Sequence, residues 1–273
     1  MTTGSAGTAF EKARTEDRAA LVGYLPAGFP DVPGAIEALR TMVDAGCDVI
    51  EIGLPYSDPV MDGPTIQAAA QKALEAGTRT SDVLRTVEAV AATGVPTLVM
   101  TYWNPVERYG AERFAADLAN AGGAGLITPD LVPDEADRWV AAADEHHLDK
   151  VFLVAPSSTD DRLRMTAQNC RGFVYAAAVM GVTGARDSSS ALAGPLVQRL
   201  REVTDEPVGV GLGVSNGDQA AEVAGFADGV IVGSAFVRRL LDAASDRAAG
   251  LSSLAELTHD LADGVRRARS GAR

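Results

Sequence analysis

The sequence of 273 residues is poor in the side chains that enzymes often use for covalent and metal chemistry. It contains two cysteines, Cys47 and Cys170, three histidines and three lysines. Two cysteines cannot build a disulfide scaffold and show no metal-ligand spacing, so the sequence is typical of a reducing cytoplasm. The shortage of lysine and histidine restricts imine chemistry and metal binding.

Basic side chains are scarce relative to acidic ones. The chain has 24 Lys and Arg against 37 Asp and Glu, a formal net charge of −13. Nucleic acids and anionic membranes attract basic surfaces, so this charge argues against both as partners. Residues 1–9 lack the apolar run of a secretory signal, and glycine and proline interrupt the longest uncharged stretch, residues 89–106. We expect a soluble, cytoplasmic protein with residues 1–7 and 270–273 frayed.

Short apolar runs rich in β-branched residues recur along the chain, and stretches with helical periodicity lie between them. Continuous hydrophobicity without strict alternation predicts strands that are covered on both faces. The eight runs cover residues 21–25, 49–54, 97–102, 125–128, 151–155, 173–178, 208–212 and 229–232. This pattern predicts an α/β fold, a (β/α)₈ or TIM barrel over residues 1–273, with extra helices near residues 8–14 and 254–268. A doubly wound open sheet is the alternative.

Barrel enzymes place their chemistry after the carboxyl ends of the strands. The scarce histidines and lysines lie elsewhere, in predicted helices or before a strand. They are His146, His147, His259, Lys12, Lys72 and Lys150. A lysine-imine aldolase and a histidine-ligated metal site are therefore disfavoured.

Carboxylates occur where the catalytic end of the second strand is expected. Glu51 lies between Ile50 and Ile52, and burial there would raise its pKa into the range useful for proton transfer, unless an arginine or backbone donors hold it as a structural group. Asp62 precedes Gly-Pro, so a turn or helix-cap role is an alternative to catalysis. Paired acids permit acid and base catalysis without histidine, and they would also suit Mg²⁺.

Glycines cluster after the last three predicted strands, in residues 181–184, 209–213 and 233–234. Barrels often bind phosphate there with backbone N–H groups and a helix N-terminus. Tight turns alone would explain any one of the clusters. The clusters do not match a dinucleotide fingerprint or a Walker sequence, which disfavours NAD and ATP. Residues 181–194 are expected to form a loop that is either a lid over the substrate or disordered.

Several segments together resemble the tryptophan synthase alpha chain family in order and spacing. They are residues 23–30, 51–67, 100–105, 129–131, 181–186, 209–215 and 233–234. The resemblance extends from about residue 21 to residue 236 and implies a (β/α)₈ barrel that cleaves indole-3-glycerol phosphate to indole and glyceraldehyde 3-phosphate. It also implies a partner, a pyridoxal-phosphate-dependent beta chain that joins the indole to serine, in a complex of two alpha and two beta chains.

The resemblance also implies roles for individual residues. Glu51 matches the general acid/base, Asp62 the carboxylate that accepts from the indole N–H, and Tyr175 the active-site tyrosine; a tyrosine bonded within the core is the alternative for Tyr175. The phosphate positions are Gly184, Gly213, Gly233 and Ser234. The indole pocket positions are Tyr24, Met100, Ile127, Leu153, Leu212 and Val232. The partner-loop positions are Tyr56, Asp58, Pro59, Asn104 and Asp130. No metal or cofactor is implied for this chain.

Two positions depart from the family pattern. Ala178 stands where serine is common, and Met61 stands where a smaller residue is usual. Three alternatives to the alpha subunit remain open at the level of sequence: a stand-alone lyase that releases free indole, a catalytically silent binding subunit, and a different, Mg²⁺-dependent phosphosugar enzyme.

Overall fold

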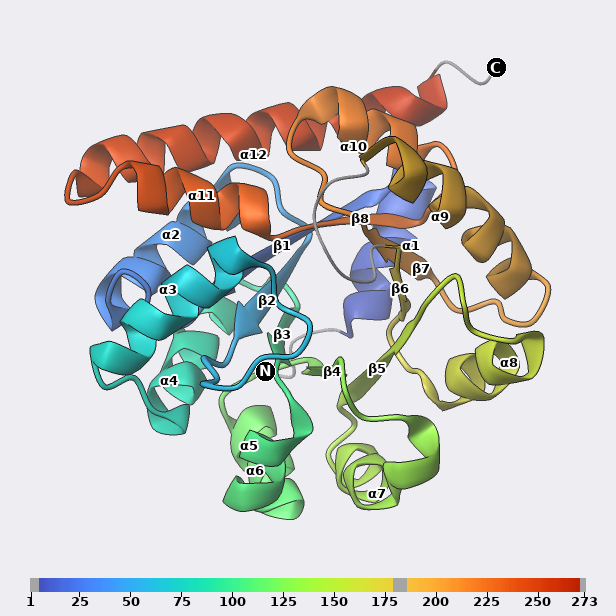
Figure 1. Ribbon diagram of the computed structural model, residues 1–273, viewed down its shortest axis with the longest axis horizontal. Helices are drawn as coiled ribbons and strands as arrows, with labels where there is room; N and C mark the ends of the chain where they lie inside the picture. Colours follow the sequence, from blue (N-terminus) through green and yellow to red (C-terminus); the bar gives the residue numbers. More distant parts are fainter. Residues whose placement is uncertain (1–4, 179–185, 271–273) are drawn as a thin grey trace.

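The computed structural model describes residues 5–178 and 186–270, without the side chains of residues 186–191 and 268–270. Its strands are parallel and form a closed barrel in sequence order, in which the last strand pairs with the first (Figure 1). The strands are β1 (Ala20–Pro26), β2 (Val49–Gly53), β3 (Thr97–Met100), β4 (Gly125–Thr128), β5 (Asp149–Val154), β6 (Val174–Ala177), β7 (Val208–Gly211) and β8 (Gly229–Val232). The predicted (β/α)₈ barrel is confirmed, and the open sheet is excluded.

Helices surround the barrel (Figure 1). They are α1 (Ala6–Thr15), α2 (Val32–Asp44), α3 (Pro64–Glu75), α4 (Thr80–Ala91), α5 (Trp103–Tyr109), α6 (Ala111–Asn120), the short 3₁₀ helix η1 (Pro133–Glu135), α7 (Asp137–Glu145), α8 (Asp160–Asn169), α9 (Arg186–Arg201), α10 (Gly217–Ala224), α11 (Ser234–Asp242) and α12 (Arg247–Ser270). The expectation of a loop over residues 181–194 is wrong from Arg186 onward, because α9 begins there. Residues 181–185 lie outside the described residues.

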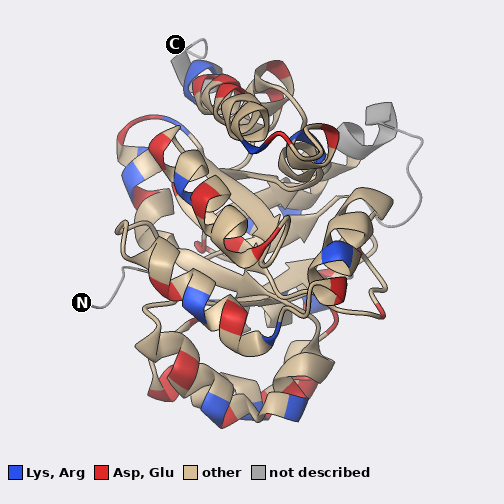
Figure 2. Ribbon diagram, turned by 90° about the vertical axis from the view of Figure 1, so that its left-hand side faces the viewer, with Lys and Arg blue, Asp and Glu red and all other residues tan. Residues whose placement is uncertain are grey.

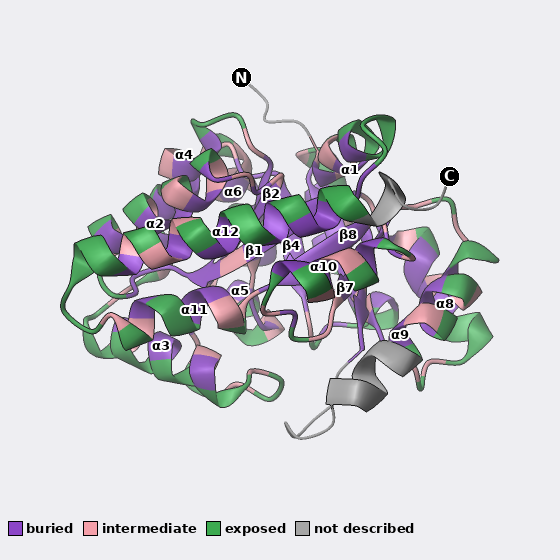
Figure 3. Ribbon diagram, turned by 90° about the horizontal axis from the view of Figure 1, so that it is seen from above, coloured by how far each residue is buried: buried purple, intermediate pink, exposed green. Residues whose placement is uncertain are grey.

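The two faces of the strands pack into separate apolar clusters. Side chains that point into the barrel form the interior cluster with α1, and those that point outward pack under the surrounding helices in the outer cluster. The interior cluster contains Val22, Val49, Leu98, Ile127, Val151, Phe173 and Ile231 among others. Figure 3 shows this arrangement as buried strands inside helices whose outward faces are exposed. Both strand faces are buried, which explains the continuous hydrophobicity of the strand sequences.

Helix α1 closes the amino-terminal end of the barrel. The ring of Phe10 stacks on Phe173 with 5.0 Å between centroids. At Gly229 on β8, an added Cβ would lie 2.4 Å from the Phe10 ring, so only glycine leaves room for this ring. Phe10 is 2% exposed and belongs to the interior cluster. The helix is therefore part of the core and does not merely lie on its surface.

A buried carboxylate holds the start of α1. Asp149 on β5 accepts hydrogen bonds from the Ser5 hydroxyl and the Ala6 backbone N–H, both at 2.7 Å. Burial raises the pKa of Asp149 to about 6, and these two hydrogen bonds oppose the rise. An acid is favourable at a helix N-terminus because it faces the free N–H groups. Ser5 and Ala6 are thus attached to β5, and residues 1–4 lie outside the described residues.

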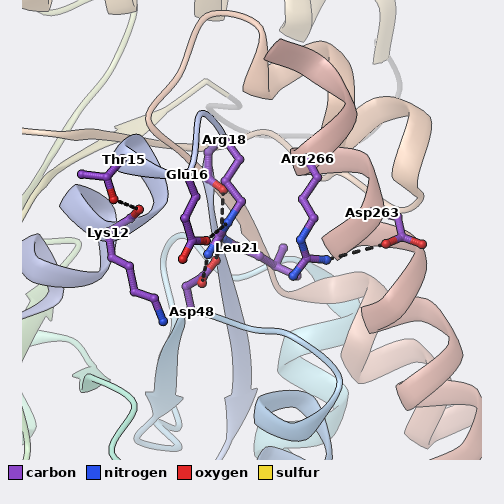
Figure 4. Close-up of polar contacts among 9 residues, drawn as sticks. Lys12, Thr15, Glu16, Arg18, Leu21, Asp48, Asp263 and Arg266 are labelled. Carbon is purple, nitrogen blue, oxygen red and sulfur yellow. Dashed lines mark hydrogen bonds and ion pairs between the residues drawn. The ribbon is translucent and has the colours of Figure 1, made fainter. Parts of the chain in front are cut away.

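A bidentate ion pair stabilises the turn after α1. The Arg18 guanidinium donates to both carboxylate oxygens of Asp48 at 2.6 and 2.8 Å, and it also donates to Glu16 at 2.8 Å (Figure 4). Asp48 in turn accepts from the Leu21 N–H of β1 at 2.9 Å. Hydrogen bonding to Asp48 raises the pKa of the Arg18 guanidinium, so Arg18 stays charged.

The outer surface is polar. Figure 2 shows both acidic and basic residues on the outer helices, whereas the strands carry few charged residues. Helix α12 packs across α2, α10 and α11. Among the described residues, none of the helices has the length and hydrophobicity needed to cross a membrane.

The Phe10→Ala variant tests the role of α1 in the core. Truncation of a buried phenylalanine typically costs about 3–5 kcal/mol, and we expect a loss of unfolding free energy in this range. The measurement is urea unfolding of the isolated chain. Leu192→Ala is the control, because Leu192 is 51% exposed and its truncation should cost little. Equal stability of F10A and wild type would show that α1 is dispensable for the core.

Candidate active site at the carboxyl end of the barrel

Glu51 on β2 points into the barrel. Its neighbours Ile50 and Ile52 belong to the outer cluster, whereas Leu98, which lies beside Glu51 in the register, belongs to the interior cluster. Glu51 is 0% exposed, and within the described part of the chain neither carboxyl oxygen has a hydrogen-bond partner. Burial raises its pKa to about 8, so the acid is largely protonated at neutral pH. A structural carboxylate held by arginine or backbone donors is not what the structure shows.

Asp62 lies in the loop between β2 and α3 and is half-buried. Burial raises its pKa, and a hydrogen bond from the Tyr102 hydroxyl opposes the rise. The helix-cap alternative fails, because Gly63 is the N-cap of α3 and, among the described residues, no side chain caps this helix. Asp62 therefore does not cap α3.

Two further tyrosines share the barrel mouth with these acids. Burial raises the pKa values of Tyr24 and Tyr175, and the negative charges of Glu51 and Asp62 raise both further. Both phenols therefore remain protonated and can act as hydrogen-bond donors. Glu51 and Asp62 thus both lie close enough to Tyr175 to influence its phenol, and their catalytic roles stay a prediction.

Glycines on neighbouring strands make room for these phenols. A Cβ at Gly53 on β2 would lie 2.2 Å from the Tyr24 hydroxyl, and one at Gly211 on β7 would lie 2.7 Å from the Tyr175 hydroxyl. Real Cβ atoms do not approach another atom this closely. Each hydroxyl therefore lies over a strand position that has no side chain.

The predicted phosphate positions lie after β7 and β8. Gly213 is exposed, has a φ of +79°, and has open space where a Cβ would be. Gly233 is the N-cap of α11, which begins at Ser234, and among the described side chains none caps this helix. A Cβ at Gly233 would lie 3.3 Å from the Tyr24 ring. The N–H groups at the start of α11 therefore lie near Tyr24, where they can bind an anion. Gly184 lies outside the described residues.

The predicted indole-pocket residues divide between the two clusters. Met100, Ile127 and Leu153 belong to or pack against the interior cluster. Leu212 and Val232 belong to or pack against the outer cluster, under the helices. Contact of these two side chains with a ligand in the barrel mouth stays a prediction.

The predicted partner-loop residues are connected to one another at the rim. The Asn104 amide donates to the Tyr56 hydroxyl at 3.1 Å, and the Trp103 N–H donates to Asp130 at 2.9 Å. Asp58 is exposed, and Pro59 beside it is half-buried.

The two departures from the family pattern lie outside the acid pair. Ala178 is buried against the outer cluster, and Met61 is 42% exposed.

Sequence reasoning missed Tyr102, which lies directly after β3 and contacts the Asp62 loop. The Tyr102 hydroxyl accepts from the Met61 N–H at 3.0 Å, and its ring packs on Tyr56 with 5.3 Å between centroids. The rule that barrel chemistry follows the strand ends could have identified it. Among the side chains that the structure describes, no three or more of the types His, Cys, Asp and Glu are grouped as metal ligands.

Comparison with known proteins gives consistent matches over nearly the whole chain. A family model described as "Tryptophan synthase alpha chain" matches residues 10–266. The tryptophan synthase alpha chain of Salinispora arenicola is 66% identical over 260 residues, covering 95% of this chain and 97% of that one. That of Acidothermus cellulolyticus is 62% identical over 261 residues, covering 96% of this chain and 97% of that one.

Solved structures agree with the sequence matches. A crystal structure of tryptophan synthase from M. tuberculosis in an open form has a TM-score of 0.88 and 53% identity, covering 96% of this chain and 99% of that one. The tryptophan synthase alpha subunit of Legionella pneumophila has a TM-score of 0.86 and 30% identity, covering 96% of this chain and 98% of that one.

The Glu51→Gln variant tests the burial of the acid through stability. With a folded pKa of about 8 and an ordinary unfolded value of 4.5, the folded state binds more protons between these pH values. The unfolding free energy of the wild type should therefore fall relative to E51Q, by at most about 1.4 kcal/mol per pH unit, from about pH 5 to pH 8 and then level off.

Urea unfolding at pH 5.5, 7.0 and 8.5 measures this difference. Glu88→Gln on the exposed face of α4 is the control, and its stability difference from wild type should stay small at each pH. A difference between E51Q and wild type that does not change with pH would mean that Glu51 is solvated or paired.

Proposed function

The chain belongs to the tryptophan synthase alpha chain family, and from that membership we propose how its residues cleave indole-3-glycerol phosphate into indole and glyceraldehyde 3-phosphate. The activity of the family is that of a lyase, and indole is passed to the beta chain for tryptophan synthesis. The observation that carries the assignment of roles is the fully buried carboxyl of Glu51, which has no hydrogen-bond partner among the described residues and, like Asp62, acts on the phenol of Tyr175.

Glu51 is the proton donor and acceptor. Protonation of indole C3 by Glu51 leaves the positive charge on the ring nitrogen. Removal of the proton from the side-chain hydroxyl by the resulting carboxylate forms the aldehyde C=O and breaks the bond to C3, whose electrons return to the ring. A pKa near 8 suits both steps, because the acid is protonated at the start and regains its proton at the end. The indole ring acts as the electron sink, so a lysine imine is not needed.

Asp62 stabilises the charge on the ring nitrogen. As a carboxylate it accepts from the indole N–H and attracts the positive charge that develops after protonation of C3. Tyr175 donates a hydrogen bond near these acids. Met100, Ile127 and Leu153 supply apolar surface for the ring. The proposed indole pocket also includes Tyr24, Leu212 and Val232.

The phosphate binds to backbone groups at the mouth. Gly213, Gly233 and Ser234 offer N–H groups, and the α11 dipole favours an anion at its N-terminus. Gly184 is proposed to complete the site. Backbone donors make a lysine unnecessary here.

The beta chain docks on the loops at the carboxyl end of the barrel. The partner loops contain Tyr56, Asp58, Pro59, Asn104 and Asp130. Large exposed apolar residues lie in the segments after β2, β4 and β6. Among the described residues these are Val60, Met61, Val132 and Leu192, with exposed fractions of 77%, 42%, 44% and 51%. An apolar rim of this kind supports a protein partner.

The remaining assignments follow the family. We propose a single domain that acts in the cytoplasm, in a complex of two alpha and two beta chains. Pyridoxal phosphate belongs to the beta chain, and the alpha chain uses neither a cofactor nor a metal of its own. Activity that survives EDTA would support the absence of a metal.

Substitution of each acid tests the proposed roles. Glu51→Gln removes the group that transfers protons, and Asp62→Asn removes the charge beside the ring nitrogen, so each should lower kcat by at least about 100-fold. The measurement is indole release from indole-3-glycerol phosphate. Glu88→Gln is the matched control. An E51Q variant as active as the wild type would show that another group moves the protons.

Addition of the beta chain tests the partner. We expect the rate of cleavage, followed as release of glyceraldehyde 3-phosphate because the beta chain consumes indole, to rise roughly 5- to 150-fold, the usual range of coupling between sites. The assay compares the isolated alpha chain with the chain plus a beta chain and serine. A rate that the beta chain leaves unchanged would instead describe a stand-alone lyase.

A further inference from the structure

The loop that carries Asp62 is exposed over much of its length. Ser57, Asp58 and Val60 are exposed, and Val60 reaches 77%. A catalytic carboxylate on such a loop requires a contact with the rigid barrel to stay in place.

Tyr102 provides this contact. It follows β3 directly and is 5% exposed, although it lies beside an exposed loop. Its hydroxyl accepts from the Met61 N–H at 3.0 Å, and Met61 immediately precedes Asp62. Its ring packs on Tyr56, five residues before Met61. One side chain from the barrel thus holds the loop at two points.

The same hydroxyl acts on the Asp62 carboxyl. Burial raises the pKa of Asp62, and hydrogen bonding with Tyr102 opposes the rise. Burial raises the pKa of Tyr102 to about 12, so the phenol keeps its proton at neutral pH. As a hydroxyl, Tyr102 can accept from the backbone and donate to the carboxylate at the same time.

We propose that Tyr102 is a positioning residue that holds the loop at Met61 and Tyr56 and thereby places the Asp62 carboxyl at the indole ring. This inference rests on the proposed function, in which Asp62 must be a carboxylate to accept from the indole N–H. Removal of the hydroxyl frees the loop at Met61 and removes a donor that favours the ionised acid. A residue with only a packing role would affect stability without changing the titration of Asp62.

The Tyr102→Phe variant tests the proposal because it keeps the ring and removes the hydroxyl. In the complex with the beta chain, we expect kcat for cleavage to fall roughly tenfold and KM to change much less. The acid limb of the kcat profile should move to higher pH by about one unit, because the pKa of Asp62 rises when the donor is lost.

Tyr109→Phe is the matched control. Tyr109 donates to Asp117 at 2.6 Å, so this variant also removes a phenol–carboxylate hydrogen bond, but one between α5 and α6. We expect Y109F to keep the wild-type kcat and pH profile. Thermal unfolding of both variants separates a loss of folding from a loss of activity. A Y102F profile that coincides with that of Y109F would overturn the proposal.

A double-mutant cycle with Asp62→Asn localises the effect. If Tyr102 acts through Asp62, Y102F should change kcat little in the D62N background. An equal tenfold loss in both backgrounds would show that Tyr102 acts elsewhere. A wild-type chain that releases no indole would contradict the proposed function. An active wild-type chain with an unaffected Y102F variant would contradict only the role of Tyr102.

Discussion

The desolvation of one carboxyl group determines the character of the site. Glu51 lies in the closed barrel with 0% exposure and, within the described part of the chain, no hydrogen-bond partner. An ionised carboxylate in such surroundings would cost several kcal/mol, so the group stays neutral and its pKa rises to about 8. A neutral acid requires no counter-ion. The scarcity of lysine and histidine is therefore compatible with proton transfer here.

The surroundings of the second carboxyl group, that of Asp62, differ from those of Glu51. Asp62 is only half-buried; burial raises its pKa, and hydrogen bonding with Tyr102 opposes the rise. Two acids in one site can take opposite roles when their environments separate their pKa values. In the proposed mechanism, Glu51 donates the proton and Asp62 attracts the positive charge that the proton creates. The position of Tyr102 at the end of β3 is thus as important to this division of roles as the identity of the two acids.

The barrel and the burial of Glu51 could be predicted from the sequence because both depend on local pattern. Apolar runs predicted each strand, and a lone carboxylate in such a run identified Glu51. Contacts between distant segments could not be predicted: Ser5 and Asp149 are far apart in the chain, so the attachment of α1 was missed. Whether the side chains of Leu212 and Val232 point inward or outward could not be predicted either. Strands that are buried on both faces show no alternation that distinguishes the two positions.

The amino-terminal closure and the site are connected through the interior of the barrel. The Phe10 ring of α1 stacks on Phe173 at 5.0 Å, and Phe173 lies 6.3 Å from the Tyr175 ring. These rings form a column from the amino-terminal end to the phenol beside Glu51. The Tyr175 hydroxyl lies over Gly211, where a Cβ would be only 2.7 Å away, so this position requires both the column and the glycine. The core that stabilises the barrel therefore also positions a group of the proposed active site.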